Sequence, residues 1–116
     1  MKNGLIVNQY GDKRWYLNDK LHRENAPAVE FANGTKHWWF NDKRHREDGP
    51  AIECDNGNKS WYLNGKYHRE DGPAIEYANG DKSWWLNDKK YSEQEYEIEM
   101  QKRTPNFEAI DNWLNQ

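Results

Sequence analysis

The chain has 116 residues, a length typical of one domain, and its hydrophobic and charged shares are similar, 34% and 32%. Seven Trp and seven Tyr offset this polar composition because large aromatic rings bury much area per residue, so we expect a thin fold with a few big rings in its core. The net charge is −3, and residues 1–91 carry 15 basic and 14 acidic side chains without a basic stripe, which disfavours nucleic-acid binding through phosphates.

A single cysteine, Cys54, excludes an intrachain disulfide and a cysteine-based zinc site. No apolar run reaches the length of a membrane span or of a signal-peptide core. We therefore expect a soluble, cytoplasmic protein that does not insert into membranes and carries no cofactor.

An internal repeat of 23 residues organises residues 1–91. Trp15, Trp38, Trp61 and Trp84 mark its period, and each is followed by an aromatic residue, a Leu or Phe, and an Asn. The full units are residues 15–37, 38–60 and 61–83, hereafter the first, second and third units, and a half unit lies on either side. One unit cannot bury its own apolar face, so neighbouring units must stack to form a core.

The third unit shows the local chemistry of the repeat. Its aromatic run ends at Asn64-Gly65, which suits a two-residue type I′ turn, whereas the other units place Asn-Asp there, a pair that tolerates this geometry less well. Pro73 cannot donate to a sheet and belongs at a strand start. The following "AIEYA" alternates Ile75 and Tyr77 with Ala74 and Glu76, as in a half-buried strand. We predict a mainly β fold, an antiparallel meander of stacked hairpin repeats with about eight strands.

Residues 92–116 leave the repeat pattern and predict a short helical cap on the 1–91 sheet. Ser92 and Glu95 have the spacing of a capping box, and Glu99 precedes Arg103 by four residues, the favourable order for a helical ion pair. Tyr96 lies one turn before Met100 on the same face. Thr104-Pro105 stops this helix and fits the start of a second one. We expect two short helices, or one helix broken at Thr104-Pro105.

The unit resembles the MORN repeat, a β-hairpin repeat of the same length. The resemblance rests on "WYLNGKYH" (residues 61–68), which matches the family's aromatic strand, turn and following His, and on the closing "YANG" (residues 77–80). The chain departs from the family pattern where Arg69 replaces the glycine after His and two extra residues precede Gly72. The "HREDGPA" form is similar to repeats of phage and large-virus proteins. The resemblance implies a repeat-built binding or scaffolding surface and brings no catalytic residues.

The stretch "HREDGPAIE" occurs at residues 45–53 and again at 68–76, with the relaxed copy "HRENAPAVE" at 22–30. Catalysis by His45, Glu47 and Asp48 is disfavoured, because active-site residues normally converge from different elements and these are adjacent and repeated. A shared metal ion is disfavoured too: equivalent His backbones in successive units lie on the order of 9–10 Å apart. We expect His packed against Trp and hydrogen-bonded at the hairpin, and Arg and Glu paired along a solvated ladder. Cys54 is interpreted as a small buried hydrophobe.

The aromatic residue after each repeated Trp points to the opposite face of the sheet, because side chains alternate along a strand. Both faces of a single layer cannot be equally buried unless the sheet curls or the helices cover part of it. Aromatic side chains left exposed would anchor a partner. The candidate binding residues are Tyr16, Trp39, Tyr62 and Trp85, together with Trp113 in the C-terminal segment.

These observations favour a non-enzymatic protein-binding repeat module. A phage-encoded inhibitor of a host defence protein, such as an anti-CRISPR-type factor, fits the small size and the repeat form. A structural protein that self-associates through its edge strands or aromatic face is the alternative. A small-molecule or carbohydrate binder that uses the aromatic face is a more distant one.

Overall fold

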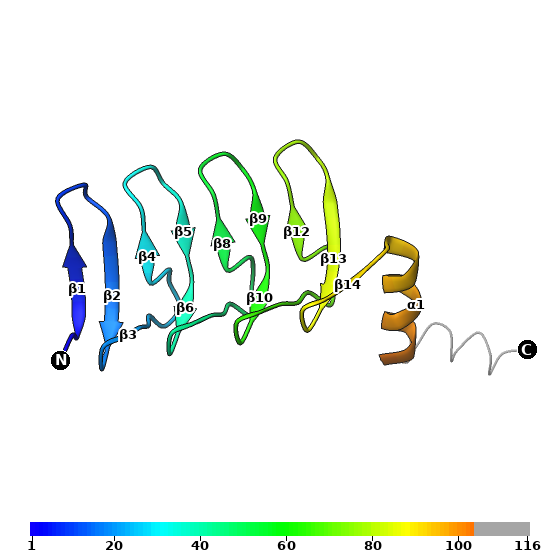
Figure 1. The fold of residues 1–116 in the computed structure, drawn as a ribbon, viewed down its shortest axis with the longest axis horizontal. Helices are drawn as coiled ribbons and strands as arrows, with labels where there is room; N and C mark the ends of the chain where they lie inside the picture. Colours follow the sequence, from blue (N-terminus) through cyan, green and yellow to red (C-terminus); the bar gives the residue numbers. More distant parts are fainter. Residues whose placement is uncertain (104–116) are drawn as a thin grey trace, which may run out of the picture.

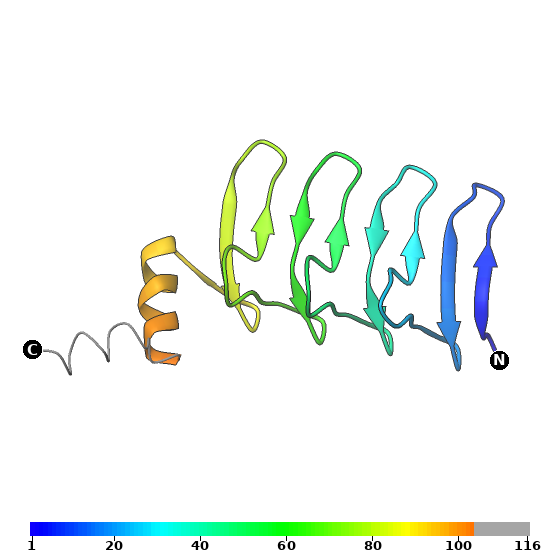
Figure 2. The same ribbon diagram turned by 180° about the vertical axis from the view of Figure 1, so that it is seen from behind.

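The computed structural model describes residues 1–103, which form a mainly β fold with 14 strands and one helix. Figure 1 shows the hairpins side by side in one layer, with the N-terminal hairpin at one end and helix α1 at the other. The view from behind shows the same row of hairpins, and none of the elements drawn as ribbons lies across the sheet (Figure 2). The predicted antiparallel meander of hairpin repeats is therefore confirmed.

The main sheet follows the order of the chain, and all of its strand pairs are antiparallel. Its path runs through β1 (Gly4–Val7), β2 (Lys13–Leu17), β4 (Val29–Glu30), β5 (Lys36–His37), β8 (Ile52–Glu53), β9 (Lys59–Ser60), β12 (Ile75–Glu76), β13 (Lys82–Leu86) and β14 (Lys89–Tyr91). The sequence predicts about eight strands, whereas residues 1–103 contain 14. The larger total arises because each unit adds a second, shorter hairpin.

The short hairpins join each unit to the next. They contain β3 (Lys20–Leu21), β6 (Trp39–Phe40), β7 (Lys43–Arg44), β10 (Tyr62–Leu63) and β11 (Lys66–Tyr67). Their Asn-Asp and Asn-Gly turns have positive φ at both residues, as a type I′ turn requires. Asp is used because its carboxylate also binds the preceding unit: Leu21 N–H donates to Asp42 at 2.6 Å, and Tyr67 N–H donates to Asp88 at 2.7 Å. These bonds offset the cost of the left-handed conformation.

The strand register assigns side chains to two faces, because directly paired residues point to the same side. The loop face carries the repeated Trp residues and a row of alternating Lys and Glu, and the aromatic face carries the second aromatic residue of each unit. The Lys–Glu row consists of Lys13, Glu30, Lys36, Glu53, Lys59, Glu76 and Lys82. The row paired beside it on the aromatic face consists of Arg14, Val29, His37, Ile52, Ser60, Ile75 and Ser83.

The core is thin and has buried side chains on both faces. Ile75 is buried as expected, but Ala74 on the opposite face is also fully buried and Tyr77 is 44% exposed. Ala74 lies beside Trp61, whose backbone N–H donates to the Ala74 carbonyl at 2.7 Å. Tyr77 lies at the hairpin turn, where its backbone N–H donates to the Asp81 carbonyl at 2.8 Å. The strict alternation expected for "AIEYA" was therefore wrong at these two residues, and the equivalent Cys54 is half-buried rather than part of the core.

Helix α1 (Glu93–Arg103) closes the C-terminal end of the sheet beside β13 and β14. The predicted capping box is present, since Glu95 N–H donates to Ser92 Oγ at 3.1 Å and Ser92 N–H donates to Glu95 at 3.3 Å. Arg103 donates to Glu99 at 3.1 Å. Buried Tyr96 ties the helix to the third unit through its hydroxyl, which donates to the Arg69 carbonyl at 2.6 Å. The predicted second helix lies outside the described residues.

Candidate functional site

On the loop face, one arginine in each unit stacks on the repeated Trp. The guanidinium carbons of Arg23, Arg46 and Arg69 lie 3.8, 3.9 and 3.8 Å from the ring centroids of Trp15, Trp38 and Trp61. Each Arg also donates to the carbonyl of the Pro four residues later, at 3.0–3.2 Å. Arg46 and Arg69 pair with both an Asp and a Glu of their own unit. These arginines are therefore internal connections of the fold, and the expected Arg–Glu ladder is confirmed.

The repeated His connects each unit to the next one. Its Nδ1 accepts a hydrogen bond from a backbone N–H in the following hairpin, which fixes the tautomer with the proton on Nε2. In the first unit the imidazole ring packs 4.2 Å from Phe40, rather than against a Trp. The three donor–acceptor pairs are Asn41 to His22 (3.1 Å), Asn64 to His45 (2.9 Å) and Asn87 to His68 (3.0 Å).

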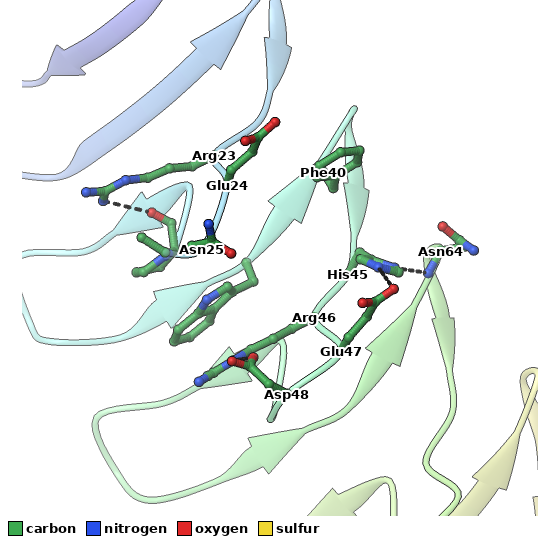
Figure 3. A pocket seen from close by; sticks show the side chains of 12 residues that line it. Arg23, Glu24, Asn25, Phe40, His45, Arg46, Glu47, Asp48 and Asn64 are labelled. Atoms are coloured by element: carbon green, nitrogen blue, oxygen red, sulfur yellow. Dashed lines mark hydrogen bonds and ion pairs between the residues drawn. The ribbon is translucent and has the colours of Figure 1, made fainter.

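A groove lies between successive "HREDGP" loops on this face, as Figure 3 shows for the first two units. Its polar side chains contact neighbours within the chain: His45 Nε2 lies 3.5 Å from Glu47, and Arg46 Nε lies 2.9 Å from Asp48. The Arg46 guanidinium holds the pKa of the Asp48 carboxyl below its ordinary value. Residues 1–103 contain no cluster of three or more metal-ligating side chains. The arrangement accounts for "HREDGPAIE" as a joint between units.

On the aromatic face, five side chains form one continuous stack across the second, third and fourth short hairpins. The Arg44 guanidinium carbon lies 4.8 Å from the Trp39 ring and 5.7 Å from the Tyr62 ring. Tyr62 stacks on Tyr67 at 4.3 Å, and Tyr67 contacts Trp85 at 5.1 Å. Burial, and then the Tyr67 hydroxyl beside it, raise the pKa of Tyr62. We call Trp39, Arg44, Tyr62, Tyr67 and Trp85 the aromatic stack.

The predicted binding residues occupy different environments. Trp39 and Trp85 belong to the aromatic stack and are partly exposed, whereas Tyr62 is only 8% exposed and forms the buried part of the stack. Tyr16 is partly exposed one unit away, where the Lys2 ammonium lies 5.0 Å from its ring centroid. Trp113 lies outside the described residues. The structure thus brings three of the five predicted residues into one stack.

Arg44 differs from every arginine of the repeated loops in lacking a carboxylate partner within residues 1–103. Its Nε and the Trp39 Nε1 are buried atoms without a hydrogen-bond partner in this described part of the chain. The equivalent atom of Trp85, its Nε1, donates to Ser83 at 3.1 Å. Trp39 has no such acceptor two residues before it, because His37 occupies the place of that serine. Burial lowers the pKa of His37, and the Arg44 charge lowers it further. The cation is thus held on aromatic rings with incomplete polar pairing.

Comparison of the units with one another separates the two faces. The His, Arg, Glu and Pro of the joint are identical in every full unit, because each unit needs the same connection to its neighbour. The aromatic face varies from unit to unit at the position paired with the second aromatic residue, where the chain has Leu21, Arg44, Tyr67 and Lys90. Arg44 and Tyr67 were missed as candidate site residues. The signal that identifies them is their variation at a fixed place in the 23-residue repeat.

Charge is also distributed unequally between the faces. The rows of the aromatic face contain three cationic side chains and no carboxylate, although the chain as a whole has a net charge of −3. The loop face alternates Lys with Glu and is internally balanced. The aromatic face is therefore complementary to an anionic surface rich in apolar groups.

The fold defines an open, single-layer β-hairpin repeat protein. A scan against protein-family models finds no match, and a search of curated proteins finds no similar sequence. Within residues 1–103, the one helix is too short and too polar to cross a membrane. The resemblance to MORN repeats stays a prediction.

Proposed function

We propose that this chain is a non-enzymatic protein-binding repeat module and that its partner docks on the aromatic face over the aromatic stack. The observation that carries the proposal is Arg44, a guanidinium without a carboxylate partner in the described chain, held between Trp39 and Tyr62 where the repeat varies. Trp, Tyr and Arg are the residues most enriched among the energetic centres of protein interfaces.

The chemistry of Arg44 indicates what the partner offers. A planar guanidinium binds a carboxylate through two parallel hydrogen bonds, and the pair is strongest where water is excluded. The rings of the aromatic stack supply an apolar surround of that kind. The partner surface therefore presents an Asp or Glu surrounded by apolar side chains, and the repeat's resemblance to phage proteins directs the search to bacterial defence proteins.

Self-association is a second candidate function, which the exposed first strand favours. Leu5, Ile6 and Val7 of β1 are all exposed, at 48%, 43% and 52%. Strand β1 lies at one end of the row of hairpins, and the strands that carry the aromatic stack, from β6 to β13, lie further along it (Figure 1). The two functions therefore use separate parts of the molecule.

Affinity capture from bacterial lysate tests the protein-binding proposal with matched variants. The baits are the wild type, Arg44→Ala, Trp39→Ala and the control Phe40→Ala, which truncates an aromatic residue of the loop face. The expected partner is retained by wild type and Phe40→Ala, and its affinity for Arg44→Ala falls by about tenfold or more. A partner retained equally by all four baits contradicts the assignment of the aromatic face.

A further inference from the structure

The first strand forms an apolar edge at the open end of the sheet. All four residues of β1, with the sequence Gly-Leu-Ile-Val, are exposed. Proteins usually protect such an edge with charge, proline or a bulge, because unpaired backbone groups recruit another strand. In β1 none of these devices is present. The opposite end of the sheet is protected by β14 and by helix α1.

Comparison with the interior units shows that β1 is more apolar than the strands equivalent to it. Leu5 and Val7 occupy the places that Ala28 and Glu30 have in the first unit, and the second and third units also have Ala and Glu there. Inside the sheet the Ala is fully buried, and Glu30 lies 3.9 Å from Arg23. At the edge the small residue becomes Leu and the charged one becomes Val.

The backbone of β1 is also ready to pair. Asn8 N–H donates to Asp12 O at 3.1 Å, and since hydrogen-bonded pairs alternate in an antiparallel ladder, Ile6 and Gly4 also face β2. Leu5 and Val7 therefore direct their N–H and C=O groups outward. Inside the sheet the residue equivalent to Leu5 does bond outward, as when Ala28 O accepts Trp15 N–H at 2.8 Å.

We propose that β1 pairs antiparallel with β1 of a second copy of this chain, which continues the sheet through a two-fold dimer. The strand is self-complementary: with Ile6 on the two-fold axis, Leu5 lies opposite Val7 of the second copy, and no charges meet. All strand pairs within residues 1–103 are antiparallel, so this contact continues the same ladder. The second copy also supplies hydrogen-bond partners for the N–H and C=O groups that Leu5 and Val7 direct away from β2.

The dimer has a geometric consequence for binding. A two-fold axis that relates two antiparallel strands of one ladder runs perpendicular to the sheet, so the two aromatic faces lie on the same side. An acidic partner that is itself dimeric would then be bound at two points, with a gain in avidity. The pairing does not depend on the proposed function, because β1 contributes nothing to the aromatic stack.

Sedimentation equilibrium of the full chain over a concentration series tests the dimer. The variants are Val7→Glu, which restores the residue of the interior strands, and Leu5→Lys. The matched control is Ile98→Glu, which places the same charge on α1 at a residue that is 55% exposed. Wild type and Ile98→Glu are expected to be dimers, and each β1 variant should raise the dimer dissociation constant at least about a hundredfold, because it buries an unpaired charge.

The outcomes are separable. Circular dichroism confirms that the β1 variants remain folded, as expected for exposed residues. A wild type that stays monomeric over the series overturns the proposal. A dimer that persists unchanged in both β1 variants overturns β1 as the interface, and assembly beyond a dimer overturns the closed two-fold arrangement. Partner capture by a monomeric Val7→Glu variant would leave the function of the aromatic face intact.

Discussion

Arg44 ends strand β7 and Arg46 follows it by two residues, yet the two side chains have different roles. The Arg46 side chain stacks on Trp38 at 3.9 Å and donates to the Pro50 carbonyl at 3.1 Å and to Glu53 at 3.3 Å. Arg44 contacts rings only, and within residues 1–103 it forms no ion pair. Arg46→Ala should therefore destabilise the fold far more than Arg44→Ala.

The magnitude follows from the contacts that each variant loses. For Arg46→Ala, the cation–π contact contributes about 1 kcal/mol, the charged hydrogen bond to Pro50 contributes roughly 1.5 kcal/mol, and the packing of the side-chain stem contributes about 0.5 kcal/mol. The total loss is about 3 kcal/mol. The ion pairs with Asp48 and Glu53 are left out of this sum because solvent screens both carboxylates, Asp48 the more strongly. For Arg44→Ala the loss is about 1 kcal/mol or less, since removing a buried unpaired Nε offsets part of the lost ring contact.

Urea unfolding followed by Trp fluorescence measures both variants against the wild type. Equal m-values would show that the change lies in the free energy of unfolding rather than in the extent of unfolding. If the two arginines destabilise the protein equally, or if Arg44→Ala is the more harmful, the division of roles between the faces is wrong.

Three further substitutions test other parts of the account. Tyr96→Phe removes the hydroxyl that receives Gly72 N–H at 3.3 Å and donates to the third loop, so hydrogen exchange in α1 should accelerate and stability should fall by about 1–3 kcal/mol; unchanged exchange would refute the docking of the helix through this group. His37→Ser, which introduces the residue of the third unit, should weaken the acid sensitivity of the fold: because burial lowers the folded-state pKa of His37, its share of stability is complete above the unfolded value of 6.5 and decreases as pH falls toward the lowered value. Urea midpoints at several pH values measure this slope, and equal slopes in the variant and the wild type would contradict it. Gly49→Ala brings Cβ to within 2.9 Å of the Arg46 guanidinium, yet the first unit has Ala26 at this place. The free energy of unfolding, measured with urea, should therefore change by less than about 1 kcal/mol. A much larger loss would show that the loops are not equivalent.

The fold was predictable because each unit repeats its local signals. Asn64-Gly65 marks a type I′ turn, Ser92 and Glu95 mark a helix start, and the 23-residue spacing of Trp places the hairpins side by side. Burial within a unit was harder to predict. Ala74 is fully buried beside Trp61 of the neighbouring strand, whereas Tyr77, at the hairpin turn, is 44% exposed. Alternation along one strand contains no information about neighbours of this kind.

The site was only partly predictable for a similar reason. Sequence alternation identified Trp39 and Trp85 as residues on the face opposite the repeated Trp, but Arg44 and Tyr67 lie on the return arm of the short hairpin. Cross-strand register brings them beside those rings, at 4.8 Å and 5.1 Å. A charged residue and an aromatic residue at one repeat position look unrelated until this register is known.

Site-specific photo-crosslinking tests the central claim, that the partner docks on the aromatic face. Tyr77 and Phe40 form a matched pair for this measurement, because both are aromatic and their exposures are 44% and 42%. The Phe40 ring packs against His22 on the loop face, and Tyr77 is equivalent in the repeat to Phe31, whose ring contacts His37 of the aromatic face. A photoreactive phenylalanine analogue is introduced at each position in turn, and adducts formed in bacterial lysate are compared. We expect a discrete protein adduct from position 77 that disappears when Arg44→Ala is added, and no such adduct from position 40. An adduct from position 40 alone would contradict it.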